Sequence, residues 1–285
     1  MTYHCRIILL MPITTHTIKE YKKQGRKIVA LTAYDYSTAK ALDKAGVDII
    51  LVGDSLAQVV LGHENTLSVT MDEMLHHAKA VVKGAENAMV VVDMPFLSYQ
   101  VSKKEAVYNA GKCLQIGANA VKLEGASKNI LKTIKKMVDI GVPVLGHIGF
   151  TPQSVNALGG HRVQGRTADS AKKLLEEAMA LEEAGCFGIV LELVPAETAA
   201  LITEGINIPT IGIGAGPDCD GQILVTDDLL GKFTDFKPSF VKRYAELGKE
   251  TENAVKNFIF DVQNKKYPQI AESFFMSESE VQRLK

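Results

Sequence analysis

Short apolar runs that lead into an acidic residue recur along this chain, and this recurrence constrains its fold more than any other feature. The runs cover residues 49–52, 90–92, 120–123 and 189–191, and the acids that follow them are Asp54, Asp93, Glu124 and Glu192. Runs of this kind are typical of strands that are buried on both faces, as in a parallel sheet. Because a carboxylate is costly to bury without a partner, the four acids indicate one polar site at the C-terminal ends of the strands.

Apolar runs of strand length alternate with stretches of helical composition along the whole chain. We expect strands near residues 28–33, 48–53, 89–93, 120–124, 142–147, 187–192, 209–212 and 222–225. Helical spacing is found between them, at residues 37–45, 71–82, 103–116, 128–139 and 168–184. This alternation predicts an α/β protein, and its continuity favours a (β/α)₈ barrel over a doubly wound open sheet.

Length and composition agree with a barrel of one domain that spans residues 1–285. A hydrophobic content of 46% supplies a large core, and (β/α)₈ barrels use about 250 residues as one domain. We expect a short N-terminal extension of about residues 1–15 and a helical C-terminal tail at about 240–285. Lys and Arg total 32 against 33 Asp and Glu, so no basic patch predicts a nucleic-acid partner.

The four cysteines are far apart and form no C-x-x-C pair. This spacing argues against a zinc knuckle and a disulfide framework, and it favours a reducing, cytoplasmic location. The apolar segment at residues 6–11 is too short to span a membrane and lacks a small-residue cleavage site. We therefore expect no signal peptide and no membrane partner, and Met11 is an alternative start to Met1.

Asp54, Asp93 and Glu124 follow the second, third and fourth expected strands, which are neighbours in a barrel. Hard oxygen ligands without His or Cys partners suit Mg²⁺, which retains open positions for water and substrate oxygens. The three acids are therefore predicted metal ligands. Each of them alone has a simpler interpretation, as a helix N-cap or as one half of a salt bridge.

Three further residues at the same ends of the strands carry candidate roles. Lys122 lies two residues before Glu124, on the same strand face, where it could neutralise a substrate carboxylate or an enolate, or only pair with the acids. Glu192 ends the sixth strand and is the candidate general base, with a raised pKa. His147 closes the fifth expected strand and could bind a ligand oxygen or serve as a core histidine.

A glycine-rich turn at residues 211–217 invites comparison with dinucleotide-binding loops. Pro217 stands where G-x-G-x-x-G requires its next glycine, and the turn lies late in the chain, so the fingerprint fails. The turn is better placed as the loop after a seventh barrel strand. There it could bind an anion or, more simply, allow close packing of the backbone.

With these residues in place, the sequence resembles the ketopantoate (3-methyl-2-oxobutanoate) hydroxymethyltransferase family from about residue 18 to about residue 245. The segments that carry the resemblance are Val52-Gly53-Asp54-Ser55-Leu56, Gly62-His63-Glu64-Asn65-Thr66-Leu67, Asp93-Met94-Pro95-Phe96, Val121-Lys122-Leu123-Glu124-Gly125, Gly146-His147-Ile148-Gly149-Phe150-Thr151-Pro152-Gln153-Ser154-Val155-Asn156, Val163-Gln164-Gly165-Arg166, Leu191-Glu192-Leu193-Val194-Pro195 and Gly212-Ile213-Gly214-Ala215-Gly216.

The resemblance implies a barrel of the phosphoenolpyruvate/pyruvate-binding type that acts in pantothenate and coenzyme A synthesis. It implies Mg²⁺ and 5,10-methylenetetrahydrofolate, which donates a hydroxymethyl group to 3-methyl-2-oxobutanoate through an Mg²⁺-bound enolate. It also implies that the chain forms a homodecamer. Carried over by position, the metal ligands are Asp54, Asp93 and Glu124, the proton acceptor is Glu192, and the 2-oxoacid contacts are Asp54, Ser55, Asp93 and Lys122.

One position departs from the family pattern. His161 stands where the family leads us to expect Tyr or Phe, which could alter a loop near the site. Two other classes of function stay open at this stage, an Mg²⁺-dependent carbon–carbon lyase or phosphomutase on a similar barrel and a non-catalytic metabolite-binding barrel. Turnover of the 2-oxoacid with the folate would distinguish them.

Overall fold

The structure, a computed structural model, describes residues 12–284. Eight parallel strands, hydrogen-bonded in chain order, close into a barrel, so the predicted (β/α)₈ barrel is confirmed and the open-sheet alternative is wrong. The strands are β1 (Ile28–Thr32), β2 (Ile49–Val52), β3 (Met89–Asp93), β4 (Ala120–Glu124), β5 (Val144–Gly149), β6 (Gly188–Glu192), β7 (Thr210–Ile213) and β8 (Gly221–Leu224).

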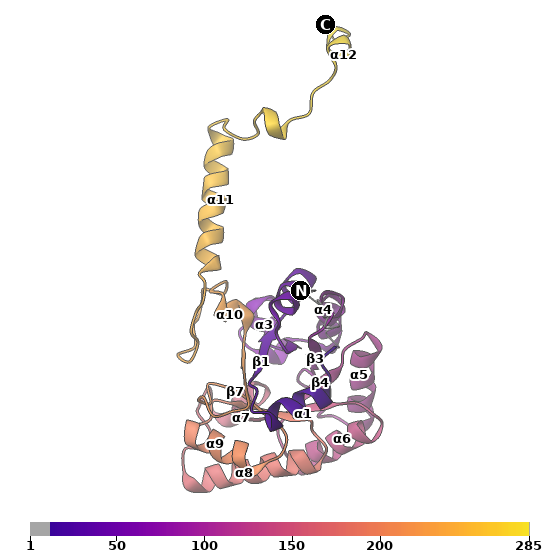
Figure 1. Ribbon diagram of the computed structural model, residues 1–285, viewed down its shortest axis with the longest axis vertical. Coiled ribbons are helices and arrows are strands. Elements are labelled where there is room, and N and C mark those ends of the chain that lie inside the picture. The colour runs from indigo at the N-terminus through magenta and orange to yellow at the C-terminus, as the bar shows by residue number, and fades with distance from the viewer. Residues whose placement is uncertain (1–11, 285) are drawn as a thin grey trace, which may run out of the picture. The chain divides into compact units, whose positions relative to one another are not determined.

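Helices that connect the strands surround the barrel, as Figure 1 shows, and further helices follow β8 in the chain. They are α1 (Thr15–Lys23), α2 (Tyr36–Ala45), α3 (Leu56–Val59), α4 (Met71–Gly84), α5 (Lys103–Gln115), α6 (Lys128–Asp139), α7 (Val155–Leu158), α8 (Ala168–Glu183), α9 (Ala196–Gly205), α10 (Thr226–Leu229), α11 (Leu247–Gln263) and α12 (Glu278–Gln282). Three 3₁₀ helices complete the set: η1 (Thr66–Ser68), η2 (Pro152–Ser154) and η3 (Ile270–Glu272).

The chain divides into two compact units. The first holds the barrel and comprises residues up to 226 together with 239–241, and the second comprises residues 227–238 and 242–285. The predicted C-terminal tail contains a long helix, α11, which begins at Leu247. The alternative start at Met11, the segment at residues 6–11 and most of the expected N-terminal extension lie outside the described residues.

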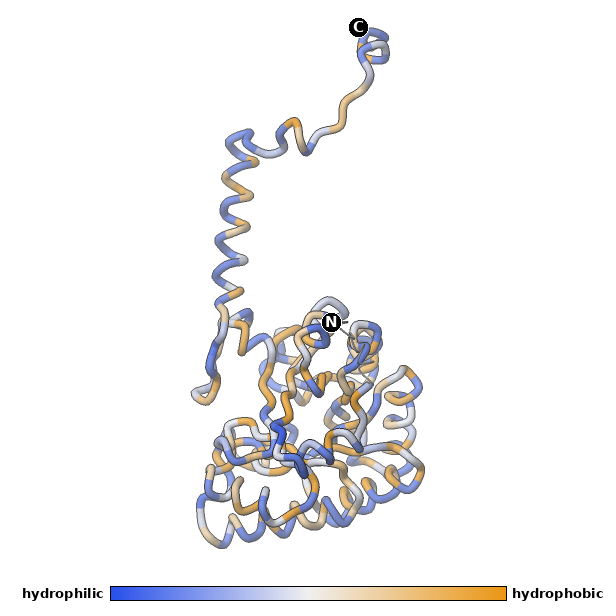
Figure 2. The backbone as a smooth tube through the Cα atoms, in the orientation of Figure 1, coloured by the Kyte–Doolittle hydropathy of each residue, from blue (hydrophilic) through white to orange (hydrophobic). Residues whose placement is uncertain are grey.

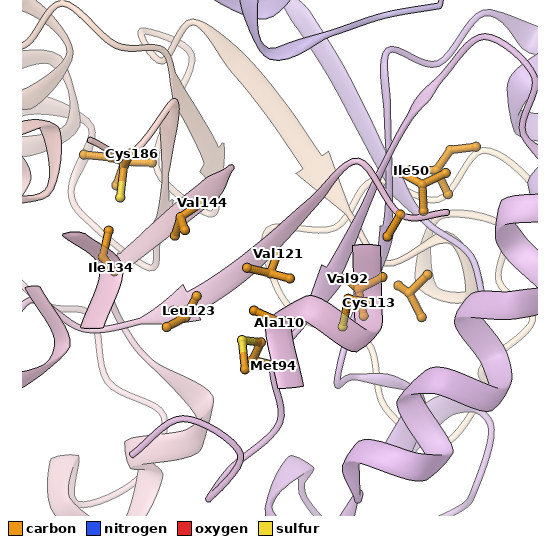
Figure 3. Close-up of a cluster of buried hydrophobic side chains, with 14 of the residues drawn as sticks. Ile50, Val92, Met94, Ala110, Cys113, Val121, Leu123, Ile134, Val144 and Cys186 are labelled. Atoms are coloured by element: carbon orange, nitrogen blue, oxygen red, sulfur yellow. The ribbon is translucent and has the colours of Figure 1, made fainter. Parts of the chain in front are cut away.

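The barrel strands separate two apolar clusters, because successive side chains along a strand point to opposite faces. On β2 and β3, Ile50 and Val92 join the cluster that packs against the helices, while Ile49 and Val91 join the cluster that fills the barrel. Figure 3 shows the outer cluster, in which strand residues meet Ala110 and Cys113 of α5. The strands are accordingly apolar over most of their length, as Figure 2 shows.

Helix α1 belongs to the inner cluster, since its fully buried Ile18 packs with the side chains that fill the barrel. Two boundaries differ from the sequence expectation. Asp54 lies two residues beyond the end of β2 rather than next to it, and His147 lies inside β5, which continues to Gly149. Within residues 12–284, no helix is both long and apolar enough to cross a membrane.

Candidate active site

The strand alternation explains why polar side chains gather at one end of the barrel interior. Val91 and Ala120 fill the barrel, and the residues two places further along the same faces are Asp93 and Lys122. The same period places Glu124, His147 and Glu192 on the inward side of β4, β5 and β6. The predicted site residues therefore form the last interior layer at the C-terminal ends of the strands.

Asp93 and Lys122 are register partners on neighbouring strands, and they form a buried ion pair between Oδ1 and Nζ. Oδ2 of Asp93 accepts a hydrogen bond of 3.1 Å from the backbone N–H of Asp54. Lys122 thus pairs with an acid of the cluster, as its simpler interpretation expects, and it lies within the polar layer, as a catalytic role requires. The two interpretations are compatible.

The acids of this layer carry unusual proton affinities because they are buried together. Burial, reinforced by the charge of Asp93, raises the pKa of Asp54 to about 7. Burial and the charge of Asp54 raise the pKa of Glu124 well above its usual value. Burial acts to lower the pKa of Lys122, but the neighbouring carboxylates outweigh it and raise the pKa above its usual value. A cation that bound here would relieve the repulsion among the carboxylates.

Gln153, at the start of the segment that follows β5, connects two of these acids. Its Nε2 donates to Oδ2 of Asp54 (2.9 Å) and to the backbone oxygen of Met94 (2.9 Å). Its backbone N–H donates to Oε2 of Glu124 (3.0 Å). The hydroxyl of Tyr99 donates to Oε1 of Gln153 (2.8 Å) and accepts from the backbone N–H of Glu124 (3.1 Å). Gln153 and Tyr99 are both buried.

His147 stands between the metal-ligand candidates and Glu192. Burial, together with the charge of Lys122, lowers its pKa well below the usual value, so the ring is neutral. Nδ1 lies 3.4 Å from Nζ of Lys122, which can only donate, so Nδ1 accepts and Nε2 carries the proton. Nε2 lies 3.2 Å from Oε2 of Glu192, although not along a hydrogen-bond direction.

Glu192, like Asp54 and Glu124, forms no ion pair with a lysine or arginine within the described residues, whereas Asp93 pairs with Lys122. Its side chain is 17% exposed, and burial raises its pKa to about 7, as the sequence interpretation expected. The backbone of Gly149 has φ of 94°, and a side chain there would come within 2.3 Å of the Glu192 carbonyl oxygen. Glycine is therefore needed where β5 passes the end of β6.

The departure at His161 falls near this residue. The ring of His161 lies 4.8 Å from that of Phe150, whose backbone N–H donates to the carbonyl oxygen of Glu192 (2.8 Å). The altered loop residue thus contacts the segment that flanks the candidate base. Ser55 lies on the other side of the site, at the start of α3, where its Oγ is 2.8 Å from the hydroxyl of Tyr34.

The glycine-rich turn follows β7 as predicted. A side chain at Gly216 would come within 2.5 Å of Cβ of Ala196, so the simpler interpretation, close backbone packing, accounts for this glycine.

The donor set of the cluster fits a hard cation. Oε1 of Glu124 is buried without a hydrogen-bond partner, and Oδ1 of Asp54 accepts no hydrogen bond from the described residues. Within residues 12–284, however, no three His, Cys, Asp or Glu side chains are arranged so that they could hold a metal ion by themselves. Mg²⁺ takes one or two protein carboxylates and completes its shell with water and substrate oxygens. The absence of a three-residue cluster among the described residues is therefore compatible with an Mg²⁺ site at these carboxylates.

Three residues of the site were missed in the sequence: Gln153, Tyr99 and Tyr34. Gln153 had a signal, because it lies in the segment at residues 146–156 that carried much of the resemblance. Tyr99 and Tyr34 had none, since each lies in a loop where an aromatic residue is ordinary.

The fold and the site together define an enzyme of the (β/α)₈ barrel class, with a carboxylate and lysine site at the C-terminal ends of its strands. Residues 12–270 match the sequence profile of ketopantoate hydroxymethyltransferase, and the chain belongs to this family. It is 56% identical to the 3-methyl-2-oxobutanoate hydroxymethyltransferase of Acetivibrio thermocellus over 262 residues, which are 92% of each chain. It is 54% identical to that of Clostridium botulinum over 275 residues, 96% of this chain and all of the relative.

Solved structures with the same fold are distant in sequence. Phosphonopyruvate hydrolase in complex with oxalate and Mg²⁺ has a TM-score of 0.60 at 13% identity, over 95% of this chain and 94% of the other. 2,3-Dimethylmalate lyase, of the phosphoenolpyruvate mutase/isocitrate lyase superfamily, has a TM-score of 0.59 at 15% identity, over 96% and 92%. These likenesses show the same barrel fold, while the family match excludes the lyase and non-catalytic alternatives.

Proposed function

We propose that this enzyme transfers a hydroxymethyl group from 5,10-methylenetetrahydrofolate to 3-methyl-2-oxobutanoate, which gives ketopantoate for pantothenate and coenzyme A synthesis. The single observation that carries this proposal is family membership over residues 12–270. The reaction removes the C3 proton of the 2-oxoacid, forms a bond from C3 to the one-carbon unit, and takes the new hydroxyl oxygen from water. Tetrahydrofolate is the second product.

Glu192 is the proposed general base. Its raised pKa of about 7 suits a group that must both accept and release a proton near neutral pH. It accepts the C3 proton, and the electron pair of the C–H bond moves into the enolate. The neutral His147, whose Nε2 lies 3.2 Å from Oε2 of Glu192 without a hydrogen bond to it, has this N–H available to contact a substrate oxygen.

Lys122 is proposed to balance the negative charge of the 2-oxoacid and of the enolate. Its raised pKa ensures that it is charged throughout the reaction. Because it is buried beside Asp93, its field acts in a site with little water, where electrostatic stabilisation is strongest. Asp54, Ser55, Asp93 and His147 complete the proposed contacts with the 2-oxoacid.

Asp54, Asp93 and Glu124 are the proposed ligand set for Mg²⁺, of which one or two carboxylates would contact the ion directly, with oxygens of the 2-oxoacid and water as the remaining ligands. When bound, Mg²⁺ would supply a Lewis acid for the keto oxygen. The buried oxygen of Glu124 without a partner supports this assignment. The folate as co-substrate, a homodecamer and a cytoplasmic location are proposals that rest on the family alone.

The proposal is tested with purified protein, 3-methyl-2-oxobutanoate, methylenetetrahydrofolate and Mg²⁺, with ketopantoate detected by mass spectrometry. Turnover should stop when EDTA removes the metal and return when Mg²⁺ is added. The matched control is 3,3-dimethyl-2-oxobutanoate, which has no C3 proton and should give no product. If the 2-oxoacid is not consumed when methylenetetrahydrofolate and Mg²⁺ are both present, the proposal is wrong. Light scattering of the same sample tests the decamer.

A further inference from the structure

Gln153 makes more contacts within the carboxylate cluster than packing alone would require. Its side chain and backbone reach residues from the ends of β2, β3 and β4, namely Asp54, Met94 and Glu124. The residue is 6% exposed, and every polar atom of its carboxamide has a partner. A buried carboxamide that is fully satisfied in this way can adopt only one orientation.

The direction of these hydrogen bonds is fixed by chemistry. The carbonyl oxygen of Met94 can only accept, so the carboxamide nitrogen must face it, and the same nitrogen donates to Asp54. Oε1 therefore accepts from Tyr99, whose hydroxyl already accepts the N–H of Glu124 and so has its proton free to donate, and from Nε2 of Gln100 (3.0 Å). The result is a directed chain from the Glu124 backbone through Tyr99 to Gln153 and Asp54.

These hydrogen bonds hold one oxygen of each acid, Asp54 and Glu124, and leave the other oxygen open. Oδ2 of Asp54 and Oε2 of Glu124 are both held by Gln153, the first by its side chain and the second by its backbone. The opposite oxygens are those without a hydrogen bond from the described residues. Hydrogen bonds of this kind orient metal-binding carboxylates and prevent their rotation.

We propose that Gln153, held by Tyr99, is a positioning residue that presents the open oxygens of Asp54 and Glu124 to a divalent cation. This inference rests on the proposed function, because it takes the two acids as metal ligands. Gln153 itself contacts neither the substrate nor the cation. It acts through the two carboxylates, so its loss should weaken cation binding before it affects the proton transfer at Glu192.

Gln153→Met tests the proposal, since methionine has similar length and cannot form the side-chain hydrogen bonds. The probe is Mn²⁺, followed by electron paramagnetic resonance of the free ion in the presence of 3-methyl-2-oxobutanoate, which reports binding without turnover. We expect affinity to fall about 10- to 100-fold, as for other residues that orient metal ligands. The Mg²⁺ concentration for half-maximal turnover should rise by the same factor, while kcat at saturating Mg²⁺ changes much less.

Gln222→Met is the matched control, because Nε2 of Gln222 donates to the backbone oxygen of Gly216 (2.9 Å) and to no acid. It should keep the wild-type affinity for Mn²⁺. Tyr99→Phe removes only the hydroxyl of the chain and should weaken Mn²⁺ binding in the same direction, by less. If Gln153→Met does not fold, the double variant Tyr99→Phe with Gln100→Met decides the question, because it removes both hydrogen bonds to Oε1 of Gln153.

Wild-type affinity for Mn²⁺ in a folded Gln153→Met, or in the double variant if Gln153→Met does not fold, would overturn the positioning role and leave the proposed function intact. A wild-type enzyme that binds no Mn²⁺ and turns over without Mg²⁺ would instead overturn the metal assignment, and this inference with it. The two failures are therefore distinguishable.

Discussion

Buried carboxylates lie at both ends of the barrel strands, and the two sets differ in how fully their oxygens are hydrogen-bonded. At the N-terminal end, Asp48 accepts from Arg26 (2.7 Å) and from the backbone N–H of Val29 (2.9 Å). The half-buried Asp220 there accepts from Lys22 (2.9 Å) and from the backbone N–H of Thr210 (2.9 Å). At the C-terminal end, one oxygen of Glu124 is buried without any hydrogen-bond partner.

This difference indicates which acids stabilise the fold and which acids have oxygens available to bind a ligand. An acid whose oxygens are satisfied by N–H groups and cations favours the folded state. An acid that is buried with open oxygens beside other acids costs stability, and such sites are expected where a ligand completes them. Substitutions at the C-terminal end should therefore affect catalysis, and those at the N-terminal end should affect stability.

The largest effect is expected for Glu192→Gln. The wild-type enzyme with Mg²⁺ should exchange the C3 proton of 3-methyl-2-oxobutanoate with deuterated water without folate, because enolisation precedes attack on the one-carbon unit. The variant should bind the 2-oxoacid and the metal but lose exchange and turnover in parallel, by about 10² to 10⁴. NMR of the C3 proton measures this. Exchange at the wild-type rate would make another group the base, with His147 the next candidate.

Asp54→Asn and Asp93→Asn should weaken Mg²⁺ activation and 2-oxoacid binding together, because the 2-oxoacid is expected to share the cation with these acids. We expect a loss of at least about 10², more than for residues that only orient ligands. The measurement is kcat/KM at several Mg²⁺ concentrations. A double variant with normal Mg²⁺-dependent turnover would contradict the metal assignment.

Lys122→Ala should lower kcat/KM by about 10², since it removes the charge that offsets the enolate in a site with little water. The variant also leaves Asp93 buried without its ion pair, so the unfolding midpoint has to be recorded beside the kinetics. An unchanged kcat/KM in a destabilised variant would leave Lys122 with only the charge-partner role.

The pH dependence of proton exchange should be weaker than these effects but diagnostic. Only the carboxylate form of Glu192 accepts a proton, and its pKa is raised to about 7. Exchange at saturating Mg²⁺ should therefore fall about tenfold per pH unit below pH 7 and level off above it. A midpoint near the ordinary glutamate value would mean that substrate binding abolishes the effect of burial.

The smallest effect on catalysis is expected for Asp48→Asn, at the N-terminal end. Loss of the charge partner of Arg26 in this buried position should lower the free energy of unfolding by about 1–3 kcal/mol, measured by denaturant titration. The value of kcat/KM should stay within about twofold of wild type, because a loss of stability of this size leaves most of the protein folded. A large loss of activity without a loss of stability would remove the contrast between the two ends.

The sequence by itself determined the barrel and the members of its polar layer. The apolar runs place Asp93 and Glu124 at the C-terminal ends of neighbouring strands, and the spacing of two residues puts Lys122 on the same face as Glu124, so the three could be assigned to one site before any contact was known. The strand ends were less certain, because β2 ends two residues before Asp54 and β5 continues two residues beyond His147. Hydrophobicity does not mark where a ladder of backbone hydrogen bonds stops.

Only the tertiary structure decided how these side chains are connected. Gln153 follows β5 in the chain, yet it contacts residues at the ends of three other strands, because the barrel closes and brings loops far apart in sequence together. The raised pKa of Glu192 likewise depends on how deeply the carboxyl is buried, an effect that outweighs the opposing charge of Lys122. Such properties arise from distances through space, and a linear pattern of residue types does not contain them.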